Sequence, residues 1–159
     1  MLLCTYTEGG YKLAKVTTIK GNLFDAPKGS IIIHACNTKG VWGSGIAKAF
    51  AHKFPKARDI YAQVCQEKGA SLIGTCLLIP AGDYVIGCLF TSKSYGQFVD
   101  PPAKILKATE TAVADLIRQN VDGKPLHACK FNAGLFRVPW PKTKAILKAT
   151  DSEFVIYDF

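Results

Sequence analysis

One short run restricts the possible folds of this chain more than any other feature. Residues 30–35, SIIIHA, form a continuous apolar segment rich in β-branched side chains. A strand with one face in water alternates apolar and polar residues, whereas a strand covered on both faces does not. The run therefore predicts a central β-strand in a sheet that has helices on both faces.

Strand-like and helix-like patterns alternate along the rest of the chain. We expect strands at residues 15–22, 30–35, 75–80, 84–90, 126–131 and 153–157. We expect helices at residues 45–54, 57–68, 102–120 and 141–150. This alternation predicts an α/β fold, a three-layer α/β/α sandwich with a mixed, largely parallel central sheet, in one domain spanning residues 1–159. In such sheets ligands bind at the carboxyl ends of the strands.

The loop after the central strand has the composition of an anion site. Gly43, Ser44 and Gly45 directly precede a predicted helix, which directs free N–H groups and the positive end of the helix dipole at one point. The known nucleotide motifs do not fit, because Ile46 stands where a P-loop needs lysine and Lys48 where a dinucleotide fingerprint needs glycine. The loop therefore indicates phosphate binding of another type.

A second loop, FNAGLFRVPW at residues 131–140, also lies between a strand and a helix. Ala133 and Gly134 are small enough for a ligand to lie against the backbone, and Phe136 could form a wall beside it. Trp140 is interpreted as a core aromatic. His52 and His127 show no chemical partner in the sequence, and we expect both to be structural.

Composition limits the class of protein. The chain has 159 residues, of which 48% are hydrophobic and 20% charged, as in globular domains. No apolar run approaches the roughly 20 residues that cross a bilayer, and the first residues lack the pattern of a signal peptide. We therefore expect an intracellular protein, in the cytoplasm, the nucleus or both, with no membrane partner. The six cysteines form no C-x-x-C pair, so we expect buried thiols, no metal site and no cofactor.

The formal net charge of +8 suits a polyanionic partner. The lysines are dispersed rather than clustered, so nucleic acid is not favoured. It stays an alternative that would show strongly salt-dependent RNA binding. We expect a monomer.

Four segments resemble a known family. GNLF, HACNTKGVWGSGIA, CLFTS and NAGLFRVPW occur in the order and spacing of a macrodomain. The resemblance covers residues 15–159 and is greatest to the small branch that contains the yeast ADP-ribose 1″-phosphate phosphatase and the related ADP-ribosyl-ester hydrolases. It implies that ADP-ribose binds in a cleft across the strand ends.

The resemblance also implies which residues form that cleft. The glycine loop would hold the diphosphate through N–H groups, the second loop would close over the phosphates, and Asn37 would face the distal ribose. The residues that it places at ADP-ribose are Gly21, Asn22, Leu23, Asn37, Trp42, Gly43, Ser44, Gly45, Ile46, Ala47, Thr91, Ser92, Asn132, Ala133, Gly134, Leu135, Phe136 and Phe159.

Two departures from the family pattern affect the expected chemistry. Asn22 replaces the aspartate that many macrodomains place near adenine, so adenine selectivity is expected to be weaker. Ser92 and Phe136 stand where the ester hydrolases carry lysine and aspartate. Because a phenylalanine can neither attack nor transfer a proton, that covalent mechanism is not available.

The implied activity is slow removal of the terminal phosphate from ADP-ribose 1″-phosphate, a by-product of tRNA splicing in the related systems. His34 and Asn37 are the predicted catalytic residues, His34 for proton transfer and Asn37 to orient ribose or water. Alternatively, His34 is a buried histidine that supports the loop. The alternative function is a binding module for ADP-ribose, either free or linked to partner proteins.

Overall fold

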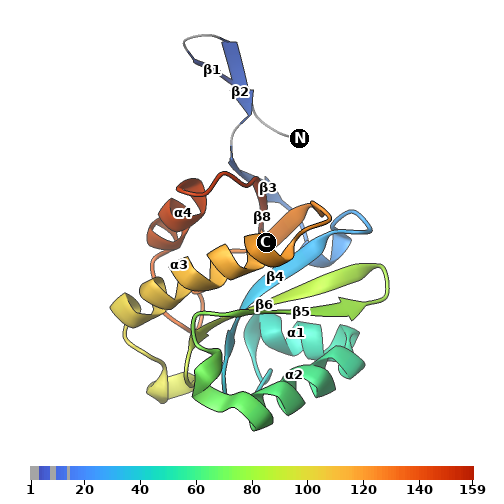
Figure 1. Ribbon diagram of the computed structural model, residues 1–159, viewed down its shortest axis with the longest axis vertical. Helices are drawn as coiled ribbons and strands as arrows, with labels where there is room; N and C mark the ends of the chain where they lie inside the picture. The colour runs from blue at the N-terminus through green and yellow to red at the C-terminus, as the bar shows by residue number, and fades with distance from the viewer. Residues whose placement is uncertain (1–3, 8–9, 14) are drawn as a thin grey trace.

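The computed structural model describes residues 4–7, 10–13 and 15–159, with side chains described from Lys15 onward. A six-stranded sheet has the order β3-β8-β7-β4-β6-β5 (Figure 1). Its strands are β3 (Val16–Lys20), β4 (Ile31–Asn37), β5 (Cys76–Ala81), β6 (Tyr84–Ser92), β7 (Leu126–Cys129) and β8 (Phe154–Asp158). All neighbouring strands are parallel except β5, which runs antiparallel to β6. The predicted mixed, largely parallel sheet is confirmed.

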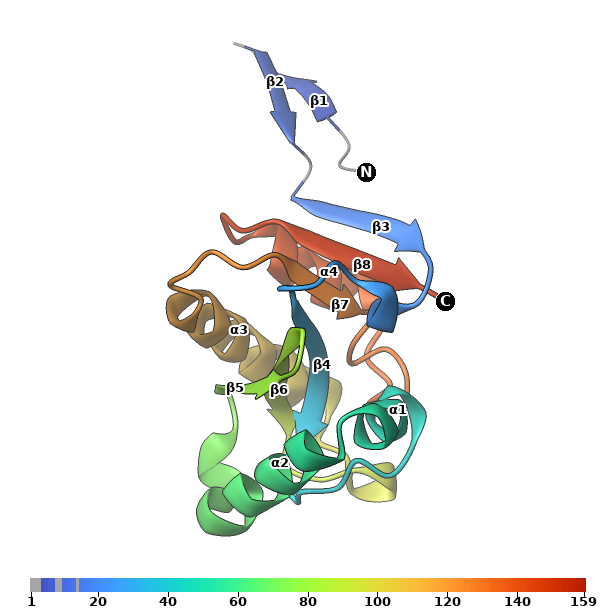
Figure 2. The same cartoon turned by 90° about the vertical axis from the view of Figure 1, so that its right-hand side faces the viewer.

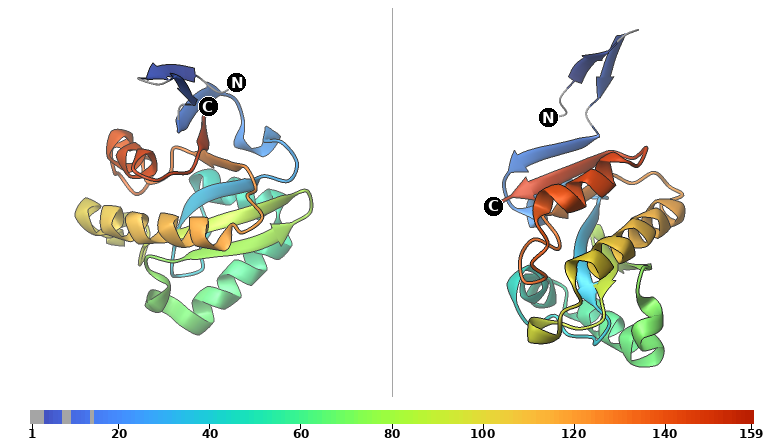
Figure 3. Two further views of the ribbon diagram at one scale, coloured as in Figure 1. Left: turned by 45° about the horizontal axis from the view of Figure 1, so that its top comes forward. Right: turned by 90° about the vertical axis from the view of Figure 1, so that its left-hand side faces the viewer.

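Four helices form the two outer layers of the sandwich. They are α1 (Gly45–Lys53), α2 (Pro55–Lys68), α3 (Pro102–Gln119) and α4 (Trp140–Lys148). Helices α1 and α2 pack on one face of the sheet with the first core cluster, and α3 and α4 pack on the other with the second. Figure 2 shows α1 and α3 on opposite sides of β4, and Figure 3 (right) shows α3 beside α4.

The remaining elements are short. Three 3₁₀ turns, η1 (Leu23–Asp25), η2 (Gly69–Leu72) and η3 (Gly96–Phe98), connect the larger elements. An antiparallel pair, β1 (Cys4–Thr7) with β2 (Gly10–Leu13), was not predicted and is separate from the main sheet. Helix α2 begins at Pro55, before its predicted start, because proline has no N–H to leave unpaired in a first turn.

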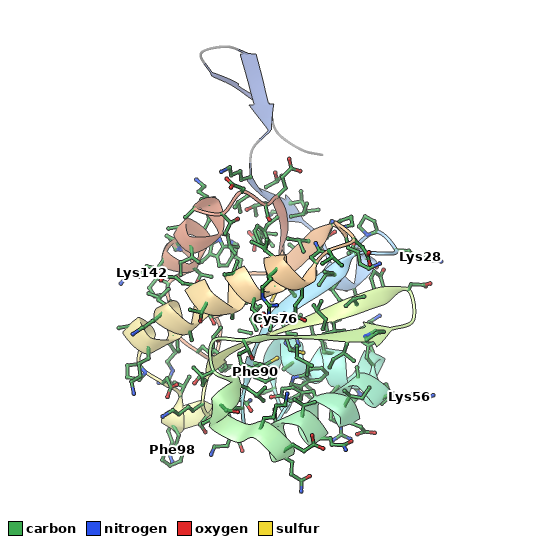
Figure 4. The ribbon with its side chains drawn as sticks, viewed as in Figure 1. Lys28, Lys56, Cys76, Phe90, Phe98 and Lys142 are labelled. Carbon is green, nitrogen blue, oxygen red and sulfur yellow. The ribbon has the colours of Figure 1, made fainter. Side chains whose placement is uncertain are left out.

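The central strand is buried on both faces, as its sequence predicts. Ile31 and Ile33 belong to the core cluster beneath α3 and α4, whereas Ile32 belongs to the cluster beneath α1 and α2. None of the three is more than 1% exposed. Figure 4 shows Cys76 and Phe90 inside the body, with Lys28, Lys56 and Lys142 at its periphery.

The cysteines are free thiols in the interior, as expected. Cys36, Cys65, Cys76 and Cys88 are buried and Cys129 is half-buried, while the side chain of Cys4 lies outside the described residues. Among the described residues, no helix has both the length and the apolar character needed to cross a bilayer.

A partly buried polar contact joins α3 to the sheet edge. The carboxylate of Asp115 accepts a hydrogen bond of 2.8 Å from the backbone N–H of Cys76 and pairs with Arg118. Gln119 donates to the Cys76 carbonyl at 2.8 Å. Partial burial raises the pKa of the Asp115 carboxyl, but the hydrogen bonds from Cys76, Arg118 and Gln119 and the charge of Arg118 outweigh it and lower the pKa.

We predict that Asp115→Ala lowers the free energy of unfolding by about 1–3 kcal/mol at pH 7, because it leaves the Cys76 N–H without its acceptor. A carboxyl with a depressed native pKa stabilises the fold above its unfolded pKa of about 3.9. The difference between wild type and variant should therefore shrink as the pH falls below about 4. Urea unfolding at pH 7 and below about pH 4 measures this difference in the free energy of unfolding. The exposed Asp122→Ala is the control. Equal losses of stability in the two variants would contradict the role given to Asp115.

Candidate functional site

A cavity of about 1130 Å³ opens at the carboxyl ends of the parallel strands. The ends of β4, β7 and β8, the turn η1, the first turn of α1 and the loop at residues 132–137 all contribute to its wall. Figure 2 shows β3, β7 and β8 directed toward the side on which α1 lies. The two loops that the sequence singled out therefore meet at one cavity.

Most of the residues predicted to bind the ligand line this cavity. They are Gly21, Asn22, Leu23, Asn37, Trp42, Gly43, Ser44, Gly45, Ile46, Ala47, Asn132, Gly134, Leu135, Phe136 and Phe159. Three of them, Ile46, Leu135 and Phe159, are among the large hydrophobic side chains that remain exposed to solvent. Exposed apolar side chains gathered at a concave surface are typical of a ligand site.

Asn37 organises the first loop from within. Its Nδ2 donates to the Val41 carbonyl at 2.8 Å, and its Oδ1 accepts from the Lys39 N–H at 2.9 Å. The hydroxyl of Tyr61, on α2, donates to the Asn37 carbonyl at 2.6 Å. The side chain predicted to orient ribose or water thus lies at the cavity wall, but its amide is already engaged in holding the loop.

The first turn of α1 presents unpaired donors to the cavity. Ser44 is the N-cap residue, yet no side chain accepts a hydrogen bond from the turn. The N–H groups of Gly45, Ile46 and Ala47 therefore have no partner in the helix. Gly45 has a φ of +60°, which favours glycine. A Cβ atom built at Gly45 would lie 3.6 Å from Leu135 Cδ1, so the two loops approach each other closely here.

Asn132 anchors the second loop to the helices behind it. Its Nδ2 donates to the Thr109 hydroxyl at 2.9 Å and to the Thr143 hydroxyl at 3.4 Å. Its backbone has a φ of +66°, and its carbonyl accepts from the Val138 N–H at 2.8 Å. These bonds close the loop into a compact turn that presents its backbone to the cavity.

Three predicted ligand contacts do not reach the cavity. The Thr91 hydroxyl is buried and donates to Asn132 Oδ1 at 2.9 Å. The Ser92 hydroxyl is buried and organises the next loop by donating to the Ser94 carbonyl and accepting from the Asp100 N–H. Ala133 is absent from the lining. Thr91 and Ser92 shape the site from behind, because their hydroxyls bond to other parts of the protein.

Asn22 also has a structural role. Its Oδ1 accepts the Phe24 N–H at 2.9 Å and caps η1. The oxygen that the sequence placed near adenine is therefore already engaged in a hydrogen bond. Trp140 packs edge to face with Phe131 against the second core cluster, which confirms its interpretation as a core aromatic.

His34 does not line the cavity, whereas its neighbours Trp42 and Cys36 do. Its side chain is fully buried, stacked on Phe50 at a centroid distance of 4.0 Å, with Trp42 at 5.0 Å. The Cys36 sulfur lies 3.5 Å from its Nε2. The predicted catalytic role of His34 stays a prediction, and in this geometry it would act through these neighbours.

Cys36 links the buried histidine to the cavity, since it is one of the lining residues. Burial raises the pKa of its thiol, but the neighbouring Cys88, His34 and Trp42 side chains outweigh burial and lower that pKa. Burial and Cys36 raise the pKa of Cys88.

Sequence reasoning missed the cationic side chains at the cavity. Lys53, Lys130 and Arg137 line it, as does His52, which was expected to be only structural. Lys53 Nζ lies 5.2 Å from the centre of the Phe24 ring, and Lys130 pairs with Asp158 at 3.2 Å. His52 and Lys53 follow Gly45 at helical spacing, so they lie on the same face of α1 as the glycine loop. This spacing could have identified them from the sequence.

His127 has a partner that the sequence did not show. Its Nδ1 lies 2.8 Å from the hydroxyl of Tyr157, a cavity residue on β8. Burial lowers the pKa of His127. This arrangement supports the structural role expected for His127.

The site combines backbone donors, cationic side chains and apolar walls, a set suited to an anionic ligand with an apolar part. The chain matches the Macro domain family over residues 33–147. It therefore belongs to the macro domain family.

Two curated relatives resemble this chain over most of its length. An ADP-ribose 1″-phosphate phosphatase of Neosartorya fischeri is 37% identical and covers 90% of this chain and 94% of its own length. An ADP-ribose 1″-phosphate phosphatase of Candida albicans is 40% identical and covers 87% of this chain and 96% of its own length.

Solved structures support the fold. The macrodomain of Mycobacterium tuberculosis DarG superposes with a TM-score of 0.76 at 22% identity, covering 91% of this chain and 97% of that one. The macrodomain of Thermus aquaticus DarG gives a TM-score of 0.73 at 23% identity, with coverage of 91% and 97%. At these identities the likeness shows the shared architecture alone.

We predict that Asn37→Ala loosens the first loop. The variant should lower the free energy of unfolding by about 1–3 kcal/mol, because Val41 and Lys39 each lose a buried hydrogen-bond partner. Amide hydrogen exchange should accelerate at Lys39. Asn22→Ala is the matched control, since it removes one asparagine cap at Phe24; it should leave exchange at Lys39 unchanged. Unchanged exchange at Lys39 in Asn37→Ala would contradict the role given to this side chain.

Proposed function

We propose that this protein hydrolyses the terminal phosphate of ADP-ribose 1″-phosphate to give ADP-ribose and inorganic phosphate. The observation that carries the proposal is the meeting of the free N–H groups of α1 with the second loop at one cavity. Relatives named for this activity align over nearly the whole chain, which supports the same substrate class here.

In this proposal the diphosphate binds at the first turn of α1. The N–H groups of Ile46 and Ala47 donate to its oxygens, where the positive end of the helix dipole adds to the attraction. The backbone of the loop at residues 132–137 closes over the phosphates, and Arg137 supplies positive charge at the rim. Asn22, Leu23 and Phe159 lie at the adenine end, as the family resemblance implies. Phe24 and Lys53 line the same cavity.

The chemistry adds water to phosphorus and breaks the bond between phosphorus and the 1″-oxygen of the ribose. A proton from the water ends on the 1″-oxygen, which becomes a free hydroxyl, and the phosphate leaves carrying the oxygen of the water. Among the described lining residues only Asp158 has a carboxylate side chain, and it pairs with Lys130. A site of this kind depends on positioning and on N–H groups that stabilise charge on the phosphate, which agrees with a slow enzyme.

His34 then acts through its neighbours as a positioning residue. Its ring supports Trp42 and Cys36, which form the cavity floor under the distal end of the ligand. A substitution of His34 should thus alter the shape of the floor rather than remove a proton donor. The expected signature of His34→Gln is a reduced rate without loss of a pH-dependent limb in the rate profile.

The central prediction concerns Gly45. Gly45→Glu places a carboxylate at the diphosphate position and should reduce phosphate release from ADP-ribose 1″-phosphate by about 100-fold or more, because the added side chain occupies the anion's place and its charge repels the anion. Gly82→Glu is the matched control: Gly82 has a φ of +62° against +60° at Gly45, lies in the β5–β6 turn and has open space around it. Both variants bear the same backbone strain and charge, so the control should retain wild-type release.

The measurement is release of inorganic phosphate by purified protein, together with ADP-ribose affinity by calorimetry. Release by wild type and by Gly82→Glu but not by Gly45→Glu supports the proposal. Tight ADP-ribose binding with no release at saturating protein would replace it with the alternative, a binding module. Equal release by the two glycine variants would place the chemistry at another site.

A further inference from the structure

Three side chains that can bind a metal ion converge beneath the cavity. Among the described residues, His34, Cys36 and Cys88 have donor atoms that all lie within 4.8 Å of one another, and all three residues are buried. The function proposed above assigns only a supporting part to His34 and Cys36 and none to Cys88. The cluster therefore calls for its own explanation.

The strand geometry produces this cluster. His34 and Cys36 are two residues apart on β4, so their side chains point to the same face of the sheet. Cys88 is the register partner of His34 on the neighbouring strand β6. A search for C-x-x-C pairs cannot find such a site, because two of its residues alternate along one strand and the third comes from another.

The separation of the donors suits a single ion. Metal–sulfur bonds of about 2.3 Å and metal–nitrogen bonds of about 2.0 Å put two ligands of one three-coordinate ion about 3.7 Å apart, close to the spacing here. Cys36 Sγ lies 3.5 Å from His34 Nε2. Only small side-chain adjustments would bring Cys88 to the same point.

The donor atoms and the rings around them indicate which metal ion the site favours. The shell contains two sulfurs and one imidazole nitrogen, a soft set that favours Cu(I) or zinc and disfavours magnesium or calcium. The rings of Phe50 and Trp42 pack against His34 and close the side that faces α1 and α2. Structural zinc takes four ligands, whereas this cluster offers three within an aromatic shell.

We propose that His34, Cys36 and Cys88 form a buried three-coordinate site for one Cu(I) ion. The ion enters through the cavity floor, where Cys36 lines the wall. Each thiol that coordinates the ion releases its proton to solvent, and His34 binds as the neutral imidazole. The bound ion joins β4 to β6 directly below the Asn37 loop.

The test uses reduced full-length protein under anaerobic conditions with Cu(I) supplied as its coloured bicinchoninate complex. Wild type should remove one equivalent of Cu(I) from the complex. Cys88→Ala should lose more than about 100-fold in affinity, since even outer-shell partners of a metal are worth about 10- to 100-fold. Cys76→Ala is the matched control: Cys76 is buried on the adjacent strand β5 but packs in the other core cluster, and it should bind like wild type.

X-ray absorption of copper-loaded wild type gives a measurement that needs no variant. One nitrogen and two sulfur neighbours in a three-coordinate spectrum support the site. Failure of wild type to compete with bicinchoninate would overturn the site, as would a spectrum without sulfur neighbours. So would an equal loss of Cu(I) affinity in Cys76→Ala and Cys88→Ala when circular dichroism shows that both are folded. Tighter binding of Zn²⁺ than of Cu(I) at the same residues would overturn the assignment to copper.

Discussion

The hydrogen bonds of Asn37 are the constraint on which the site depends. Asn37 ends the central strand, and its amide bonds the Lys39 N–H and the Val41 carbonyl while Tyr61 holds its backbone. The next residues are thereby folded back over α2, where Gly40 approaches Ala62 so closely that a Cβ would lie 3.2 Å from its Cα. The path of this loop fixes where α1 begins, and with it the direction of the N–H groups that meet the phosphates.

An asparagine side chain also holds the second loop. Asn132 binds Thr91, Thr109 and Thr143, so it joins the end of β6 to α3 and α4 before the loop reaches the cavity. Two asparagines, one on each side of the cavity, thus use their amides to hold backbone in place. Because protein hydrogen bonds hold both loops, the N–H groups need little rearrangement to bind an anion, which lowers the entropic cost of binding.

The layers and most element positions could be predicted from the sequence, because the run at residues 31–33 and the helical stripe of α3 are set by burial alone. The family resemblance placed the glycine loop and the second loop at one cavity. The predicted contacts that the structure places elsewhere belong to residues whose role depends on side-chain direction. Thr91, Ser92 and His34 lie in the right segments, but strand alternation and packing against Phe50 turn them inward. Arg137 was missed because its charge resembles that of any exposed residue until the fold places it beside the cavity. Lys53 could have been found from its helical spacing to Gly45.

The crystal structure of the complex with ADP-ribose tests the central claim most directly. We expect diphosphate oxygens within about 2.7–3.2 Å of the Ile46 and Ala47 nitrogens, with the hydrogen bond from Asn37 to Val41 unbroken. Such a result would show that the ligand binds with the loop in the conformation that Asn37 holds. A diphosphate bound away from α1, or a loop in which Asn37 leaves Val41 to contact the ligand, would contradict the account.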